Sequence, residues 1–111
     1  MLRQAETGDI VLFAGKDVGS TLIRSLTRSK FDHVGLLVKL SDHLILFESL
    51  AGKGVCKWRW DSLQSTNYWQ THCTKVVYRK LLGVKRSNEF LNQVRDFVTE
   101  NLGKKYKLTI S

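Results

Sequence analysis

The chain has 111 residues, of which 42% are hydrophobic and 25% charged, and its formal net charge is +8. This composition predicts a single globular domain over residues 1–111 and excludes a disordered chain. No apolar run approaches the roughly 18 residues that a membrane span needs, and the first residues lack the apolar core of a signal peptide. We therefore expect a cytoplasmic protein that can associate peripherally with membranes.

The N-terminal half predicts a strand, a helix and a hairpin of two strands. The first strand is short and rich in β-forming residues. The helix has Val18, Leu22 and Leu26 at four-residue spacing, which gives it an apolar stripe. Both hairpin strands are nearly continuous apolar runs, which indicates burial on both faces. The expected ranges are 8–13 for the strand, 17–29 for the helix, and 31–40 and 44–49 for the hairpin.

The C-terminal half predicts two further strands and a last helix. Residues 55–60 alternate, with Cys56, Trp58 and Trp60 on one face, as in a half-buried strand. Ser87 is a good N-cap for the last helix, and Gly103 suits the position just after its end. The other expected ranges are a polar loop with one helical turn over 61–72 and a strand over 73–82. The chain is thus predicted to be α+β, with a mostly antiparallel sheet and flanking helices.

Two side chains carry the most informative pattern. His33 opens one predicted hairpin strand, and Glu48 ends the other. Pairing of the strands brings both side chains to one end of the sheet. An imidazole held by a carboxylate is the base half of a nucleophilic site. The alternative is an ordinary hydrogen-bonded histidine beside a carboxylate that needs a partner because it is buried.

Other polar residues point to structural roles. Cys56 and Cys73 are interpreted as core residues, and the three histidines and two cysteines lack the spacing of a metal site. There is no glycine-rich phosphate loop either, so we expect neither a metal nor a cofactor. His43 is expected to be exposed in the hairpin turn. Asp9 is expected to form hydrogen bonds in a turn.

The basic charge favours anionic partners such as lipid headgroups, although a solvated basic surface is the simpler interpretation. Trp58, Trp60 and Trp69 lie near Lys57 and Arg59 in the sequence. They suggest a patch at a membrane interface, a patch on which nucleic-acid bases stack, or partly buried core residues. Nucleic acid is a distant third possibility.

Six segments, taken in their order along the chain, resemble a known family. They are Thr7–Phe13, Asp32–Val38, Leu46–Ser49, Gly54–Val55, Lys75–Arg79 and Leu102–Tyr106. In this order they resemble the permuted NlpC/P60 (papain-like) hydrolases, above all the YaeF/YiiX-like branch. The similarity spans nearly the whole chain, and it rests on the order and spacing of short motifs.

The resemblance implies a circularly permuted papain-like fold with His33 as catalytic base and Glu48 as its orienting residue. It also implies a nucleophilic cysteine on a helix soon after the segment that matches Gly103 to Tyr106. The implied activity is that of a cysteine hydrolase or acyltransferase, which acts on peptide amides or lipid esters through a thioester.

No cysteine follows Tyr106 in the sequence, so the family nucleophile is absent from this chain. Three explanations remain open at this point. The C-terminal segment that carries the cysteine has been lost by truncation, or the protein is a natural pseudo-enzyme, or Cys56 or Cys73 has taken over. The alternative function is a non-catalytic module that binds a lipid or a protein on the same fold.

Overall fold

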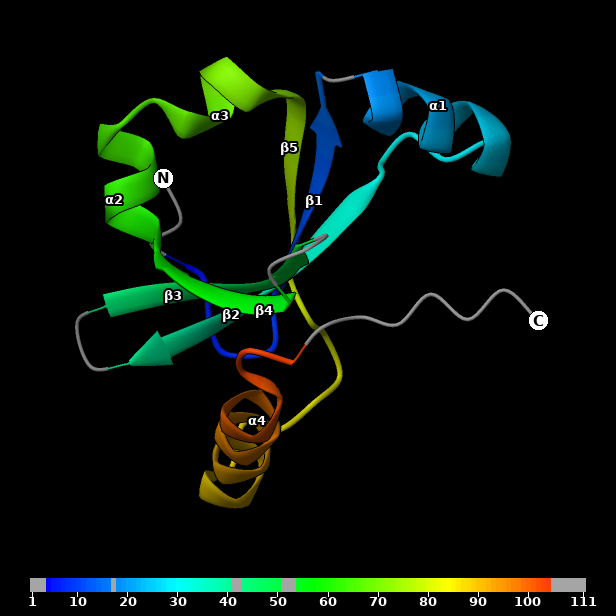
Figure 1. Ribbon diagram of the computed structural model, residues 1–111. Helices are drawn as coiled ribbons and strands as arrows, with labels where there is room; N and C mark the ends of the chain where they lie inside the picture. The colour runs from blue at the N-terminus through cyan, green and yellow to red at the C-terminus, as the bar shows by residue number, and fades with distance from the viewer. Residues whose placement is uncertain (1–3, 17, 41–42, 51–53, 105–111) are drawn as a thin grey trace.

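The computed structural model describes residues 4–16, 18–40, 43–50 and 54–104. Its centre is a five-stranded antiparallel sheet in the order β4-β3-β2-β1-β5 (Figure 1). The strands are β1 (Ile10–Gly15), β2 (His33–Leu40), β3 (His43–Leu50), β4 (Gly54–Arg59) and β5 (Cys73–Arg79). The helices are α1 (Val18–Thr27), α2 (Trp60–Ser65), α3 (Tyr68–His72) and α4 (Asn88–Asn101). The predicted α+β class with an antiparallel sheet is confirmed.

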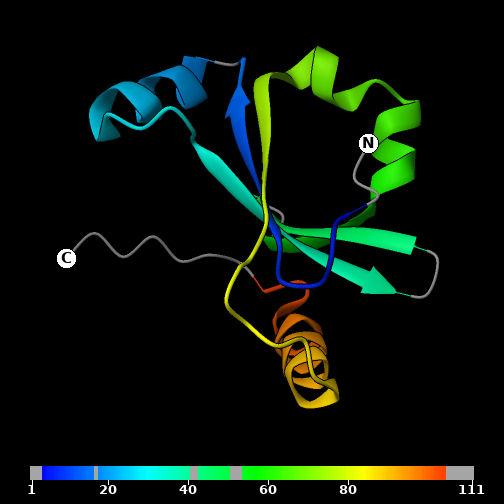
Figure 2. The same ribbon diagram turned by 180° about the vertical axis from the view of Figure 1, so that it is seen from behind.

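The two faces of the sheet carry different helices. α2 and α3 lie on one side of the sheet and α4 lies on the other (Figures 1 and 2). The main core fills the side under α2 and α3, where alternate strand residues pack against the two short helices. Its buried members include Val11, Phe13, Leu37, Leu46, Trp60 and Leu63. The alternation of strand side chains places the residues between them on the α4 side.

The region 61–72 is the main error of the sequence-based prediction, because it belongs to two short helices, α2 and α3, rather than to a polar loop with one helical turn. Trp60, expected to end a strand, is the first residue of α2. Trp60 and Leu63 are one helical turn apart, and both are buried. Their neighbours in the sequence are mostly polar, so two apolar positions are too few to show the helical period. Trp69 on α3 also packs against the core.

Smaller differences occur at the ends of strands. The fifth strand ends at Arg79 rather than at residue 82, and β2 begins at His33 rather than at residue 31. His43 was expected to be exposed in the turn, but it is the first residue of β3 and is half-buried. The side chain of His43 contacts the end of β4, where Arg59 Nη2 lies 3.0 Å from His43 Nδ1.

The apolar stripe predicted for α1 does not enter the core. Leu22 is 57% exposed and Leu26 is 75% exposed, while the side chain of Val18 lies outside the described part of the structure. The helix is held to the sheet by a polar contact instead, since Arg24 Nη1 donates to the carbonyl oxygen of Gly15, at 2.9 Å, and pairs with Asp32.

The expected ends of α4 are confirmed. Ser87 Oγ accepts a hydrogen bond from the Phe90 amide at 3.2 Å, which caps one of the amides that a helix start leaves without a partner. Gly103 has a φ of +82°, a left-handed conformation that favours glycine just after a helix.

The tryptophans divide between core and surface. Trp60 is 8% exposed and Trp69 packs on the same cluster, so neither belongs to an interfacial patch. Trp58 is 36% exposed on the outer strand β4. Within the described residues, every helix is too short or too polar to traverse a lipid bilayer.

Candidate functional site

His33 and Glu48 meet at one end of the sheet, as the sequence predicts. His33 Nε2 lies 2.8 Å from Glu48 Oε2. Glu48 stands directly opposite Gly35 on the neighbouring strand, two residues from His33, so the contact crosses the hairpin diagonally. Residues two apart share one face of a strand, and both side chains therefore lie on the face that α2 and α3 cover.

The two partners differ in exposure in a way that suits their chemistry. The side chain of Glu48 is 8% exposed and that of His33 is 26% exposed. A buried carboxylate is costly without a hydrogen-bonding partner, and here the imidazole supplies one. The imidazole remains reachable from solvent, whereas the carboxylate that holds it does not.

The contact assigns different roles to the two ring nitrogens of His33. An ionised carboxylate only accepts hydrogen bonds, so the pairing places the hydrogen on Nε2. In the neutral ring Nδ1 is then the nitrogen that accepts a proton. This is the arrangement that a general base oriented by a carboxylate requires.

Asp32 fixes the backbone from which His33 projects, a role that the sequence analysis did not predict. Its Oδ2 accepts a hydrogen bond from the Gly15 amide at 3.1 Å and pairs with Arg24, and its side chain is 6% exposed. Its own amide donates to the Phe13 carbonyl at 3.0 Å. The start of β2 is thus joined to the end of β1 and to α1. An aspartate directly before the histidine was the available signal.

Aromatic rings form the wall beside the imidazole. The rings of Phe13 and His33 have centroids 5.5 Å apart, and Trp69 stacks on Phe13 with ring centroids 5.1 Å apart. Trp60 continues the row at 5.0 Å from Trp69. The indole nitrogens Nε1 of Trp60 and Trp69 are buried and have no partner among the described residues. This apolar wall lowers the local dielectric, which strengthens the His33–Glu48 attraction.

Tyr68 adds a neutral hydroxyl near the pair. Burial raises the pKa of Tyr68, and the negative charge of Glu48 raises it further, followed by that of Cys73. The phenol therefore stays protonated across the physiological range and can donate a hydrogen bond.

Gly35 explains how Leu46 fits under the site. A Cβ atom at residue 35 would lie 2.5 Å from Leu46 Cδ1, closer than any real contact. Leu46 is fully buried in the core. The glycine therefore leaves room for Leu46 to pack in the core next to the position of Glu48.

The two cysteines lie on β4 and β5. Cys56 stands directly opposite Glu48, and Cys73 stands opposite Gly15 at a register shift between β1 and β5. Reactive thiolates sit beside cations or helix N-termini, not opposite carboxylates. The placement of Cys56 therefore favours the structural interpretation over the takeover hypothesis.

The chain that leaves α4 returns to this end of the sheet. The Gly103 amide donates to the Val55 carbonyl at 2.9 Å, and the Val55 amide donates to the Lys104 carbonyl at 3.0 Å. Val55 precedes Cys56, which faces Glu48 across β3 and β4. Residues 103–104 thus lie along β4 close to the carboxylate end of the site.

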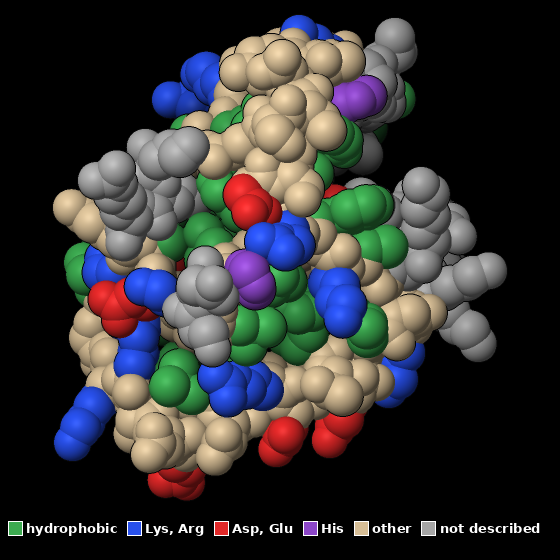
Figure 3. Space-filling model, turned by 90° about the vertical axis from the view of Figure 1, so that its left-hand side faces the viewer, with side chains coloured by type: hydrophobic (Ala, Val, Ile, Leu, Met, Phe, Trp, Pro, Cys, Tyr) green, Lys and Arg blue, Asp and Glu red, His purple; other side chains and the backbone are tan. Residues whose placement is uncertain are grey.

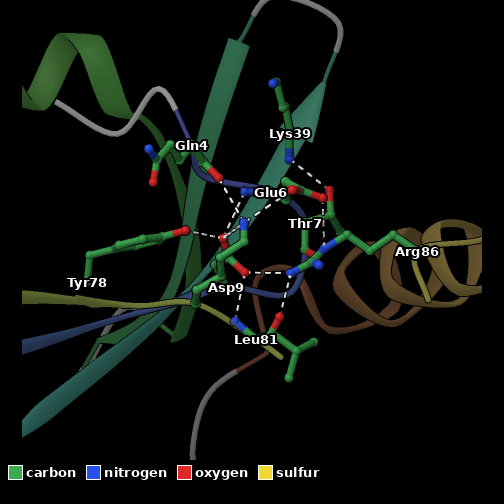
Figure 4. A network of polar contacts seen from close by, with 9 residues as sticks. Gln4, Glu6, Thr7, Asp9, Lys39, Tyr78, Leu81 and Arg86 are labelled. Atoms are coloured by element: carbon green, nitrogen blue, oxygen red, sulfur yellow. Dashed lines mark hydrogen bonds and ion pairs between the residues drawn. The ribbon is translucent and has the colours of Figure 1, made fainter. Parts of the chain in front are cut away.

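A second polar cluster surrounds Asp9 near the other end of β1 (Figure 4). Asp9 is fully buried; it accepts hydrogen bonds from the amides of Glu6 and Leu81, both at 2.9 Å, and pairs with Arg86 at 2.6 Å. Tyr78 also donates its hydroxyl hydrogen to this carboxylate. The expected hydrogen-bonding role of Asp9 is confirmed.

The chemistry of this cluster is structural. Burial by itself raises the pKa of Asp9, but hydrogen bonds from Tyr78 and from the two amides, with the charge of Lys80, lower it below the usual range. The fixed carboxylate binds the N-terminal turn to the end of β5 and to the start of α4. Among the described residues, no group of three or more metal-ligating side chains was found.

Comparisons with known proteins add no further constraint. No family model matches the chain, and a search of curated protein sequences found no significant match.

Proposed function

We propose that this chain carries the base and orienting residues of a permuted papain-like cysteine hydrolase or acyltransferase, with His33 as base and Glu48 as its partner. The observation that carries the proposal is the 2.8 Å contact between His33 Nε2 and the buried Glu48 carboxylate. It leaves Nδ1 to accept a proton, on a side chain that is 26% exposed beside the ring of Phe13.

The proposed reaction is acyl transfer through a thioester. Nδ1 of His33 takes the proton of a cysteine thiol, and the thiolate attacks the carbonyl carbon of an amide or ester. The imidazolium, stabilised by Glu48, then gives its proton to the leaving amine or alcohol as the thioester forms. Water or an acceptor hydroxyl or amine, deprotonated by His33, attacks the thioester and restores the thiol.

The nucleophile is proposed to lie in polypeptide that follows Lys104. The hydrogen bonds of Gly103 and Lys104 with Val55 support this, because they hold residues 103–104 against β4 one residue from Cys56, which stands opposite Glu48. By contrast, Cys56 stands on the far side of Glu48 from the strand that bears His33.

The first experiment is the intact mass of the native product in its source cells, with labelling by a thiol-reactive probe and peptide mapping. We expect a product longer than 111 residues, labelled at a cysteine within a few tens of residues beyond Ser111. In that product His33→Ala should slow labelling and acyl transfer by about 10²–10⁴-fold. His72→Ala is the matched control, because His72 is exposed on α3. Unchanged activity in His33→Ala would refute the assignment.

A second candidate is a non-catalytic module that binds a lipid or protein through the same site. The position of Cys56 favours it, because a carboxylate stands directly opposite this cysteine, whereas reactive thiolates are typically found beside cations or helix N-termini. A native product that ends at Ser111, with both cysteines unreactive, would establish this candidate and remove the enzyme proposal.

A lipid substrate is supported by the surface of α1. Leu22 and Leu26 are exposed, as are the nearby Arg28 and Lys30, and the Arg24–Asp32 pair joins this helix to the residue before His33. Exposed leucines next to cations suit an anionic membrane surface.

We expect binding to anionic vesicles at low salt, weakened about tenfold by Leu26→Ser because the leucine no longer enters the lipid. Leu82→Ser is the control, since Leu82 is equally exposed after β5. Sedimentation with vesicles measures both. A protein that ignores anionic vesicles at low salt would contradict the membrane proposal.

A further inference from the structure

A groove of about 550 Å³ lies between α4 and the face of the sheet formed by β2, β3 and β4. Its floor is apolar and includes Val38, Ile45 and Phe47 from the sheet, with Val98 and Leu102 from the helix side. The side of the molecule in Figure 3 shows hydrophobic side chains bordered by Lys and Arg side chains. The volume falls within the range of about 300–1,000 Å³ of small-molecule sites.

The groove lies on the opposite face of the sheet from His33 and Glu48. Ile45 and Phe47 alternate with Leu46 and Glu48 along β3, so they point to the other side. Leu46 belongs to the core beneath α2 and α3. The groove is therefore a separate site, and an inference about it does not depend on the proposed function.

The charged residues of the groove all have the same sign. Lys57, Arg59 and Arg95 line it, and none of the described lining residues is acidic. Arg59 already pairs with Asp61 at 3.0 Å. Lys57 and Arg95, which come from β4 and α4, have no carboxylate partner within the described residues. An apolar floor with two such cations is complementary to one anion attached to an apolar chain.

We propose that this groove binds a free single-chain anionic amphiphile, such as a fatty acid, with its hydrocarbon chain over Val38, Phe47 and Val98 and its head group at Lys57 and Arg95. The floor removes the hydrocarbon from water, which is the source of affinity. The cations select the sign of the head group and its orientation. A ligand with only an apolar chain would leave the cations unpaired, and a ligand with only an anionic group would leave the apolar floor exposed to water.

The test uses dodecanoate below its micelle concentration, with binding measured by calorimetry and by the fluorescence of the tryptophans. We expect saturable binding that weakens in the order dodecanoate, dodecanol, dodecyltrimethylammonium. Affinity should rise about fourfold for each added methylene, the factor that corresponds to burying one CH₂ group. Butyrate and inorganic phosphate should not bind measurably, because they have the charge without the chain.

Two variants separate the head group from the chain. Lys57→Gln with Arg95→Gln should weaken dodecanoate about tenfold and leave dodecanol unchanged. Thr99→Trp should block both ligands, because Thr99 is an exposed position on α4 that lines the groove. Lys75→Gln, an exposed cation on β5, is the matched control and should change neither.

Several outcomes would overturn the proposal. They are the absence of saturable dodecanoate binding, equal binding of the cationic amphiphile, equal binding of butyrate or phosphate, and binding that Thr99→Trp does not affect. A concentration-dependent dimer that Thr99→Trp dissociates, in a protein that does not bind dodecanoate, would show instead that the groove is a surface for self-association.

Discussion

The Glu48 carboxylate gives the two nitrogens of the His33 ring different protonation states. Because Nε2 faces the carboxylate oxygen at 2.8 Å, the neutral ring is expected to be the Nε2–H tautomer. Side-chain ¹⁵N NMR distinguishes the two tautomers directly. In Glu48→Ala the restraint is gone and both tautomers should appear, whereas the signals of His72, exposed on α3, should not change. A wild-type ring with its hydrogen on Nδ1 would contradict the assigned roles.

Tyr78 provides a second prediction about a single residue. Burial, together with the hydrogen bond to the negatively charged Asp9, raises the pKa of Tyr78 to about 12. The unfolded phenol titrates near pH 10. The folded state therefore holds this proton more tightly, so its contribution to stability is complete below about pH 10 and is lost as the pH rises towards 12.

This contribution can be measured with Tyr78→Phe. The variant should lose about 1–2 kcal/mol at neutral pH, because Asp9 loses a hydrogen bond, and its stability should fall less steeply above pH 10 than that of the wild type. Urea unfolding at several pH values gives both quantities. The phenolate absorbance of the wild type should show a late step that is missing in the variant. If the absorbance step that Tyr78→Phe removes lies near pH 10 instead, the pKa of Tyr78 is not raised.

The elements of this chain differ in how well their sequences predict them. The hairpin strands were predicted because long apolar runs need a sheet that is covered on both faces, and α4 because Ser87 and Gly103 mark its ends. α2 and α3 were missed, since helices of six and five residues offer too few apolar positions to reveal a period. The two helices are stabilised by the packing of Trp60 and Trp69 against the core. A local sequence pattern does not reveal such contacts.

α4 provides the prediction at the scale of one element. Ser87→Ala removes the side-chain oxygen that accepts from the Phe90 amide, and it should cost about 1 kcal/mol in the free energy of unfolding. Ser65→Ala is the control, because that hydroxyl donates only to the Ser62 carbonyl at the exposed end of α2. Urea denaturation of both variants measures the difference. Equal stability of the two would show that the cap does not contribute.

At the scale of the whole molecule, the His33–Glu48 pair was predictable because fifteen residues and one hairpin separate its members. The cluster around Asp9 was predictable only in part. Its hydrogen-bonding role in a turn was expected, but its partner Arg86 is 77 positions away, and no local pattern links the two. The Arg24–Asp32 pair spans only eight positions, but it was missed because no sequence pattern shows how α1 packs against the start of β2.

The Asp9 cluster joins the N-terminal turn, β5 and α4, so its loss should affect the stability of the whole domain. Arg86→Gln would take from a fully buried carboxylate its nearest cation, leaving Lys80 at 3.6 Å, and should cost about 3 kcal/mol. Lys85→Gln, an exposed neighbour, should change stability by less than about 0.5 kcal/mol. The measurement is again the free energy of unfolding in urea.

The same cluster sets how the domain responds to acid. Because the folded pKa of Asp9 is lowered, its contribution is complete above the unfolded value of about 3.9 and is lost as the pH falls below it. Asp9→Asn, which cannot titrate, should therefore be less stable than the wild type at pH 7, and the difference should narrow as the pH falls below about 4. If the stability of the two proteins falls in parallel down to pH 2, protonation of Asp9 does not account for the loss of stability in acid.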